Sequence, residues 1–363
     1  MKKILVIAGT RPEIIKLAPI IILAKQNYKN KIKIEFCFTG QHKKMAAVVL
    51  KFFNLKPNYI LSIMQDSQSI DNIASQVFNK MPKIFESAKP EVVIVQGDTT
   101  TAVMSAICAF QNKIPIAHVE AGLRTYNYNS PFPEEFNRKT ISTISNYNFC
   151  PTIKSKNNLL KEGIIKSKIY LVGNTVVDAI KIIINKNRNL KLTEKNRNIK
   201  SPYILITAHR RESFGKEFEN ICFAIKESAL KNPNINFVYP VHLNPNVQKP
   251  VKNILEKIKN IILIEPVNYL QLLTLIKNSL FVLTDSGGIQ EEAPSFNKFT
   301  IVMRKFTERT ESIDLGISEL VGTDPQKICK AIERQIQNPF TKKVINPFGD
   351  GFASERILKI LSN

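Results

Sequence analysis

Short apolar runs alternate with amphipathic segments along the whole chain. A short apolar run is typical of a buried strand, whereas apolar positions at helical spacing are typical of a helix that packs on a sheet. The alternation therefore predicts an α/β fold with parallel sheets. In the first half we expect helices over 12–26, 69–86 and 101–111, and strands over 3–9, 32–38, 92–97, 115–120, 147–150 and 168–173.

The second half repeats this alternation without a residue-level repeat. Strands are expected over 203–209, 236–241, 261–266, 280–285 and 299–303. The polar run 185–201 separates the two halves and predicts a seam between two domains. Ligands bind at the carboxyl ends of parallel strands, so we expect strand ends from both domains to face a central cleft.

Composition favours a folded protein with a strongly basic surface. The chain has 363 residues, 44% of them apolar, with 52 Lys and Arg against 30 Asp and Glu, for a net charge of +22. Such a charge suggests a nucleic-acid partner. However, the lysines are spread through predicted helices and linkers, with no basic arm or aromatic-basic ribbon. We therefore expect a solvated surface that attracts anions and no nucleic-acid partner.

The cysteines indicate neither a metal site nor a disulfide framework. The five are far apart, most lie in apolar runs, and no CxxC pair exists. We expect a reducing compartment and no metal. The apolar stretch 14–24 contains Lys16 and Pro19 and is too short to span a membrane. A soluble, cytoplasmic protein without a membrane partner is expected.

Three carboxylates follow predicted strand ends or begin a helix: Asp98, Glu120 and Glu134. With Arg124 and Arg138 nearby, they have the chemistry of proton-transfer groups. Each also has a structural explanation. Asp98 could cap the following helix, Glu120 could pair with Arg124, and Glu134 suits a first helical turn. Three such acids together favour a site.

Two glycine-containing loops predict anion binding at helix starts. The first, GTRPEIIK (9–16), places Arg11 beside a helix start but is not GxGxxG, so a dinucleotide redox cofactor is disfavoured. The second, TDSGGIQEEAP (284–294), gives the strongest phosphate signal. One of the acids of its helix could hold sugar hydroxyls, and Arg304 and Arg309 could add charge.

Further cationic side chains lie at or just after the ends of predicted strands. His209, Arg210 and Arg211 stand together in AHRRESFG, which favours anion binding over a solvated Arg pair. His242 lies in the turn PVHLNPN, with a weaker case.

Nine segments, in order, closely resemble the bacterial non-hydrolysing UDP-N-acetylglucosamine 2-epimerases. They are GTRPEIIKLAP, QGDTTT, HVEAGLRT, PFPEEFNR, VGNTVVDA, HRRESFG, YPVHLNPN, TDSGGIQEEAP and NPFGDG. The resemblance spans nearly the whole chain and implies two Rossmann-like domains of the glycosyltransferase-B type, 1–172 and 173–345. It also implies a C-terminal helix within 346–363 that crosses back to the first domain, and a homodimer.

The resemblance implies reversible conversion of UDP-GlcNAc to UDP-ManNAc, a precursor of surface polysaccharide, without a cofactor. Elimination of UDP gives a 2-acetamidoglucal, to which UDP adds back after protonation on the opposite face. It implies acid/base roles for Asp98, Glu120 and Glu134, with their order left open, and a catalytic or diphosphate-binding role for His209. The implied substrate contacts are Arg11, Lys16, Ser286, Gly287, Gly288, Glu292 (on the ribose) and Arg309.

Two positions depart from the family pattern. Thr310 stands where relatives usually have proline after Glu-Arg, which would loosen the loop that carries Arg309. Some relatives also have a second, activating UDP-GlcNAc site, which here would use Gln41, His42, Arg210, Arg211 and His242. Ser67 replaces an arginine of that site, so activation is in question.

Three other readings stay open at this point. A hydrolysing epimerase would release ManNAc and UDP, and a retaining glycosyltransferase would need an acceptor. A UDP-sugar-binding or nucleic-acid-binding protein would show no turnover.

Overall fold

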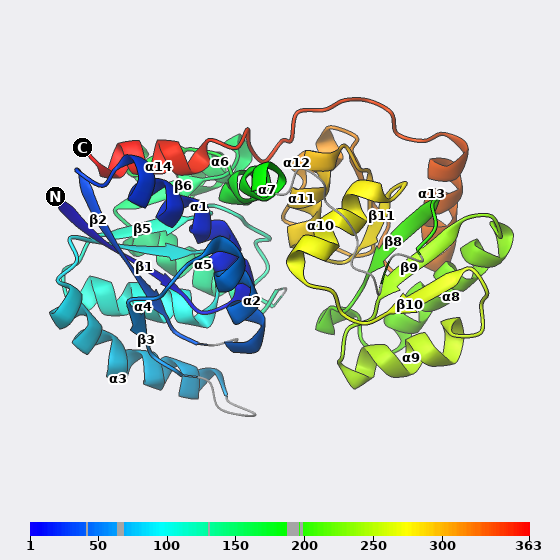
Figure 1. Cartoon of the computed structure of the whole chain (residues 1–363), viewed down its shortest axis with the longest axis horizontal. Helices are drawn as coiled ribbons and strands as arrows, with labels where there is room; N and C mark the ends of the chain where they lie inside the picture. The colour runs from blue at the N-terminus through cyan, green and yellow to red at the C-terminus, as the bar shows by residue number, and fades with distance from the viewer. Residues whose placement is uncertain (41–42, 64–68, 130, 187–195, 197–198) are drawn as a thin grey trace. The chain divides into compact units, whose positions relative to one another are not determined.

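The computed structural model describes residues 1–363 except 41–42, 64–68, 130, 187–195 and 197–198. It divides into two compact units (Figure 1). The first unit contains Met1–Ile182 and Phe348–Asn363, and the second contains Ile183–Pro347. Gln41, His42, Ser67 and most of the expected seam 185–201 lie outside the described residues.

The first unit is built on a seven-stranded sheet in the order β3-β2-β1-β4-β5-β6-β7, and its pairings are parallel. The strands are β1 (Lys2–Ala8), β2 (Ile32–Phe38), β3 (Tyr59–Ile60), β4 (Val92–Gln96), β5 (Ile116–Val119), β6 (Tyr147–Cys150) and β7 (Ile169–Leu171). The helices are α1 (Arg11–Asn27), α2 (Lys43–Phe53), α3 (Ile70–Ala88), α4 (Thr100–Gln111), α5 (Glu134–Ile144), α6 (Ile153–Lys161), α7 (Thr175–Lys186) and, from the chain end, α14 (Ala353–Leu361).

The second unit has a six-stranded parallel sheet in the order β10-β9-β8-β11-β12-β13. The strands are β8 (Tyr203–Thr207), β9 (Asn236–Pro240), β10 (Ile261–Ile264), β11 (Val282–Thr284), β12 (Thr300–Val302) and β13 (Ser318–Leu320). The helices are α8 (Lys216–Lys231), α9 (Pro245–Leu255), α10 (Tyr269–Asn278), α11 (Gly287–Glu292), α12 (Glu311–Asp314) and α13 (Pro325–Gln337).

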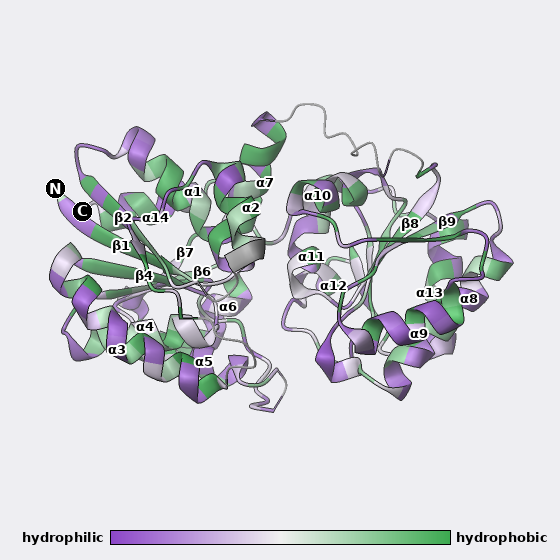
Figure 2. Ribbon diagram, turned by 60° about the horizontal axis from the view of Figure 1, so that its bottom comes forward, coloured by the Kyte–Doolittle hydropathy of each residue, from purple (hydrophilic) through white to green (hydrophobic). Residues whose placement is uncertain are grey.

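The predicted α/β class with parallel sheets is confirmed. Each strand expected from the sequence is present, and among the strands of the described residues only the short β3 and β13 were not expected. Central strands are apolar along their length because helices cover both faces of a parallel sheet. All residues of β4 and β8 are buried. Figure 2 shows the apolar strands inside each unit and mixed polar and apolar helices around them.

The strand order places a topological switch point in each sheet. β1 pairs with β2 on one side and β4 on the other, and β8 likewise lies between β9 and β11. Chain connections leave in opposite directions at such a point, so the loops after these strands open a crevice where ligands bind. The loops after β4, β8 and β11 carry Asp98, His209 and Ser286, and the loop after β1 leads into α1, which begins at Arg11.

The end of the chain returns to the first unit. Asp178 of α7 accepts hydrogen bonds from the backbone N–H groups of Ala353 (3.2 Å) and Ser354 (2.8 Å), which begin α14. Arg356 donates to the carbonyl of Val172 at 2.9 Å. Helix α14 also packs on α1, beside which it is drawn in red in Figure 1. The first unit therefore extends past the expected boundary at residue 172, since α7 is joined to α14.

No helix among the described residues is both long enough and apolar enough to cross a membrane.

Candidate active site

Glu13 joins the two loops at the switch point of the first sheet. Its carboxylate accepts hydrogen bonds from the N–H groups of Gly9 (3.0 Å) and Thr10 (2.7 Å) and from the hydroxyl of Thr99 (2.8 Å). Burial raises the pKa of Glu13, and these hydrogen bonds counteract part of the rise. The start of α1, where Arg11 lies, is thereby fastened to the loop that carries Asp98.

Glu120 lies directly after β5 and is buried. One of its carboxylate oxygens, Oε2, accepts from Lys16 Nζ at 2.5 Å and also from the side-chain amide of Gln96. Its backbone has a φ of +69°, a left-handed conformation that is uncommon for residues other than glycine. Strained residues of this kind cluster at functional sites. Three elements, α1, β4 and the loop after β5, thus position one buried carboxylate beside a buried ammonium group.

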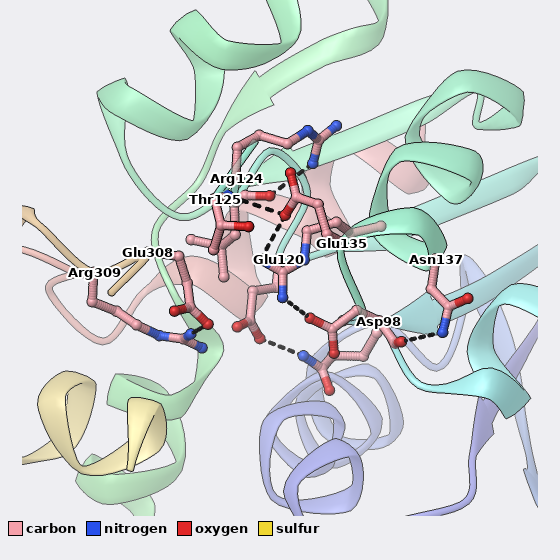
Figure 3. A network of polar contacts seen from close by, with 12 residues as sticks. Asp98, Glu120, Arg124, Thr125, Glu135, Asn137, Glu308 and Arg309 are labelled. Carbon is pink, nitrogen blue, oxygen red and sulfur yellow. Dashed lines mark hydrogen bonds and ion pairs between the residues drawn. The ribbon is translucent and has the colours of Figure 1, made fainter. Parts of the chain in front are cut away.

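Asp98 does not cap helix α4; residues of helix α5 hold it in place instead. The N-cap of α4 is Thr99, whose hydroxyl oxygen accepts from the N–H of Ala102 at 3.0 Å. Arg138 lies 2.5 Å from the Asp98 carboxylate, and Asn137 donates to the Asp98 carbonyl at 2.8 Å (Figure 3). The Asp98 side chain remains 28% exposed. The capping explanation is therefore wrong, and the carboxylate is both oriented and accessible.

Helix α5 begins at Glu134, as its first-turn explanation expected, and the Glu134 side chain is partly buried. The next residue, Glu135, is fully buried and accepts from the N–H groups of Thr125 and Tyr126, each at 3.0 Å (Figure 3).

Arg124 forms a two-pronged ion pair with Glu162, at 2.8 and 2.7 Å. The alternative pairing of Arg124 with Glu120 is therefore wrong.

His118 supports this region from inside the sheet. The residue is fully buried in β5, with its Nε2 2.8 Å from the carbonyl oxygen of Gly97 and its Nδ1 3.3 Å from the hydroxyl of Ser142 on α5. Burial lowers the pKa of His118 to about 4, so the ring is neutral at neutral pH. It connects the residue before Asp98 to the helix that carries Glu134.

In the second unit, His209 and Arg210 follow β8 at the switch point. Their backbone N–H groups both donate to Asp285 Oδ2, at 2.6 and 2.7 Å. Asp285 directly follows β11 and is completely buried, whereas the His209 side chain is 43% exposed. The ring of His209 stacks on that of His242, with centroids 5.2 Å apart and planes 10° apart. Arg211 is exposed.

The glycine loop opens α11, as predicted, and Ser286 is its N-cap residue. A Cβ atom at Gly287 would lie 2.8 Å from the guanidinium carbon of Arg309, closer than side-chain carbons normally approach. A Cβ atom at Gly288 would meet only ordinary contacts, the nearest being Ser286 Oγ at 3.8 Å. A side chain at position 287 would therefore force the guanidinium of Arg309 to shift.

The arginines near α11 are already paired with acids. Arg309 lies 2.9 Å from Glu291 and also contacts the Glu308 carboxylate (Figure 3). Arg304 is buried between Glu212 (2.8 Å) and Glu308 (3.2 Å). This burial argues against the expectation that Arg304 supplies charge to a phosphate, since Glu212 and Glu308 already occupy its guanidinium.

Glu292 and Thr310 complete the region. Glu292 is buried and accepts from the hydroxyl of Tyr269 at 3.0 Å. Thr310 has a φ of −77°, within the range that a proline imposes, and α12 begins directly after it. The backbone here keeps the conformation that the family proline would favour.

The supporting residues that were not expected from the sequence include Gln96, His118, Tyr269 and Asp285. Gln96 and Asp285 stand at the ends of apolar strands, which is a usable signal. His118 and Tyr269 gave none, because a buried polar residue cannot be told from an exposed one without its partners. Across the part of the chain that the structure describes, no group of three His, Cys, Asp or Glu side chains could hold a metal ion.

The fold and the strand-end acids define a class, that of two-domain, Rossmann-like proteins of the glycosyltransferase-B type. A crystal structure of UDP-GlcNAc 2-epimerase from Neisseria meningitidis bound to UDP-GlcNAc matches with a TM-score of 0.94 and 42% identity, covering 99% of both chains. A structure of the Methanocaldococcus jannaschii enzyme in complex with UDP-GlcNAc and UDP matches with a TM-score of 0.86 and 39% identity, again covering 99% of both.

The sequence comparisons give the family. The family profile for UDP-N-acetylglucosamine 2-epimerase matches residues 24–362. The UDP-N-acetylglucosamine 2-epimerase of Campylobacter jejuni is 46% identical, covering 99% of this chain and 97% of the relative. That of Escherichia coli K12 is 43% identical, covering 99% and 98%. The chain belongs to the UDP-N-acetylglucosamine 2-epimerase family, which is a family of enzymes.

Proposed function

We propose that this protein is a non-hydrolysing UDP-N-acetylglucosamine 2-epimerase that interconverts UDP-GlcNAc and UDP-ManNAc. The observation that carries this proposal is the buried Glu120 carboxylate held by Lys16 and Gln96, with the oriented Asp98 on the neighbouring strand end. The family membership supplies the substrate class. The product would serve as an amino-sugar precursor of surface polysaccharide.

Epimerisation at C2 requires two opposed proton transfers. In the first, a base removes the C2 proton as the bond between C1 and the phosphate oxygen breaks, which leaves a C1=C2 double bond and free UDP. In the second, an acid protonates C2 from the other face while UDP adds back to C1. Carboxylates at fixed positions in a water-poor site suit both steps. Asp98, Glu120 and Glu134 are the proposed acid/base groups.

The second unit is proposed to bind UDP. The start of α11 presents Ser286, Gly287 and Gly288, and the backbone N–H groups in the first turn of a helix attract anions such as a diphosphate. Glu292, oriented by Tyr269, is the proposed ribose ligand. Arg309 and His209 are the proposed hydrogen-bond donors to the departing phosphate, where negative charge develops. Arg11 and Lys16 are the proposed contacts of the first unit.

The test is an incubation of the purified protein with UDP-GlcNAc in D₂O without added cofactor. Proton NMR should show UDP-ManNAc appearing and deuterium replacing the C2 hydrogen in both UDP-sugars. Release of free ManNAc and UDP would indicate a hydrolysing enzyme instead. Absence of exchange at C2 would refute the elimination mechanism.

The variants Asp98→Asn and Glu120→Gln separate catalysis from binding. Each keeps the size of the side chain but removes the base, so exchange should fall by about 10²–10⁴-fold while UDP still binds. An equal loss of exchange and of UDP affinity in these variants would favour a non-catalytic binding protein instead. Addition of sugar acceptors to the same assay tests for glycosyl transfer.

A homodimer is proposed as well. Light scattering should then give about twice the chain mass of 41.2 kDa.

A second, activating UDP-GlcNAc site is proposed to use Arg210, Arg211 and His242. Gln41 and His42, which would complete it, lie outside the described residues. Activation would appear as a rate that rises more steeply than first order with UDP-GlcNAc concentration.

A further inference from the structure

Asp285 is a buried carboxylate with only half of its hydrogen-bonding capacity used. Its Oδ2 accepts the backbone N–H groups of His209 and Arg210. Its Oδ1 is buried and accepts no hydrogen bond from any residue that the structure describes. A buried acceptor without a partner destabilises a fold, and more so when it is charged. The two hydrogen bonds that fasten the turn after β8 use Oδ2 and do not explain why Oδ1 is buried.

The group that Oδ1 faces is the imidazole of His209. The distance from Oδ1 to Nδ1 is 3.9 Å, which is too long for a hydrogen bond but within reach of a small rotation of the ring. Catalytic hydrogen bonds are often long before the ligand is bound and tighten in the complex. The ring of His242 is nearly parallel to that of His209, so a shift of the His209 ring within its own plane would keep the two rings parallel.

The surrounding backbone is fixed, so the freedom lies in the His209 side chain. Asp285 holds the N–H of His209, and the buried hydroxyl of Tyr239 donates to the carbonyl of Ala208 at 2.6 Å. The ring itself is 43% exposed. A ligand that reaches the ring on its exposed side can therefore move Nδ1 toward Oδ1 without disturbing the turn.

We propose that Asp285 is the positioning residue of His209: in the UDP-bound enzyme its Oδ1 accepts the Nδ1–H of the imidazole, which leaves Nε2 to act on the departing phosphate. This assignment rests on the proposed function. A carboxylate in this position selects one tautomer and stabilises the imidazolium when it forms. It gives a function to the one oxygen of Asp285 that the fold does not use.

Asp285→Asn is the informative substitution because an amide can satisfy the fold but not the imidazole. Its oxygen can still accept both backbone N–H groups, which places an N–H₂ donor opposite Nδ1. The ring should then carry its proton on Nε2. We expect kcat to fall by about 10²–10⁴-fold, by analogy with wrong-tautomer variants of other histidine enzymes, with UDP affinity changed by less than about threefold.

A double-mutant cycle separates positioning from folding. If Asp285 acts through the imidazole, Asp285→Asn should cost less than about threefold in kcat when His209 is already glutamine. An equal loss in both backgrounds would overturn the proposal. Asp178→Asn is the matched control, because Asp178 is also a buried carboxylate that caps two backbone N–H groups but serves α14. It should lower the melting temperature and leave kcat within about threefold.

The tautomer can be measured without turnover. The chain has four histidines, so ¹⁵N-histidine labelling gives a simple spectrum in which His209→Gln assigns the signal. With UDP bound, the wild-type ring should be protonated at Nδ1, and Asp285→Asn should move the proton to Nε2. An unchanged tautomer would refute the inference even if the enzyme epimerises. Failure of the D₂O assay with the expected tautomer would refute only the proposed function.

Discussion

His118 is a fully buried imidazole, and its burial should make the first unit sensitive to mild acid. The folded ring resists protonation, with a pKa lowered to about 4 from an ordinary 6.5, whereas the unfolded chain accepts the proton near pH 6.5. Stability therefore falls as the pH drops through 6.5 and stops falling near pH 4. Because of this pKa difference, the first unit should be about 2 kcal/mol less stable at pH 5, and about 3 kcal/mol less stable at pH 4, than at neutral pH.

His118→Gln isolates this effect, since the glutamine amide can still donate to the Gly97 carbonyl but does not titrate. The variant should be about 1–3 kcal/mol less stable than wild type at pH 7.5 because it loses packing and the Ser142 contact. At pH 5 that gap should shrink by about 2 kcal/mol. Comparison with the variant cancels Glu13 and Asp178, whose pKa values are raised by burial and which favour folding in acid.

Urea unfolding at pH 7.5 and pH 5, followed by far-ultraviolet circular dichroism, measures the gap because the chain has no tryptophan for fluorescence. Hydrogen exchange of β5 assigns the transition to the first unit. Ser142→Ala is the control: it loses the Ser142 hydroxyl but keeps the imidazole, so it should retain the acid dependence. An equal gap between wild type and His118→Gln at both pH values would refute the reasoning.

Three further predictions concern the site and the core. Glu120→Gln should lower kcat by about 10²–10⁴-fold with UDP affinity kept within about threefold; an equal loss of UDP binding, by calorimetry, would contradict a proton-transfer role. Gly287→Ala should lower stability by about 1–3 kcal/mol in thermal unfolding because its methyl group would displace Arg309, and a cost no larger than that of Gly288→Ala would contradict this. All five cysteines are buried, and the thiol pKa of Cys37 is raised to about 12, so Ellman's reagent should find no fast thiol at pH 8 and five in urea.

The sequence predicted most of the fold because long apolar runs decide the parallel strands. β4 and β8 are buried along their whole length, and such runs are visible without tertiary information. The short strands β3 and β13 were not visible, since two or three residues carry too little pattern. The first domain was predicted too short because its link to the chain end depends on Asp178 and the N–H groups of α14.

The candidate site was predicted in part. Strand ends and helix starts located Asp98, Glu120 and the glycines of α11, because the chain direction alone fixes which loops follow β4, β5 and β11. Pairing between distant residues could not be predicted. Arg304 meets Glu212, 92 positions away, and Arg124 meets Glu162 rather than Glu120. Local spacing therefore finds where charges gather but not which of them neutralise one another.

The return of the chain end to the first unit has a consequence for synthesis on the ribosome. Domains usually fold in the order in which they emerge. Here the second unit is one uninterrupted stretch, while the first needs Phe348–Asn363 to supply the helix that Asp178 caps. The first unit can therefore be completed only after residues 348–363 have left the exit tunnel, and the second unit can finish ahead of it.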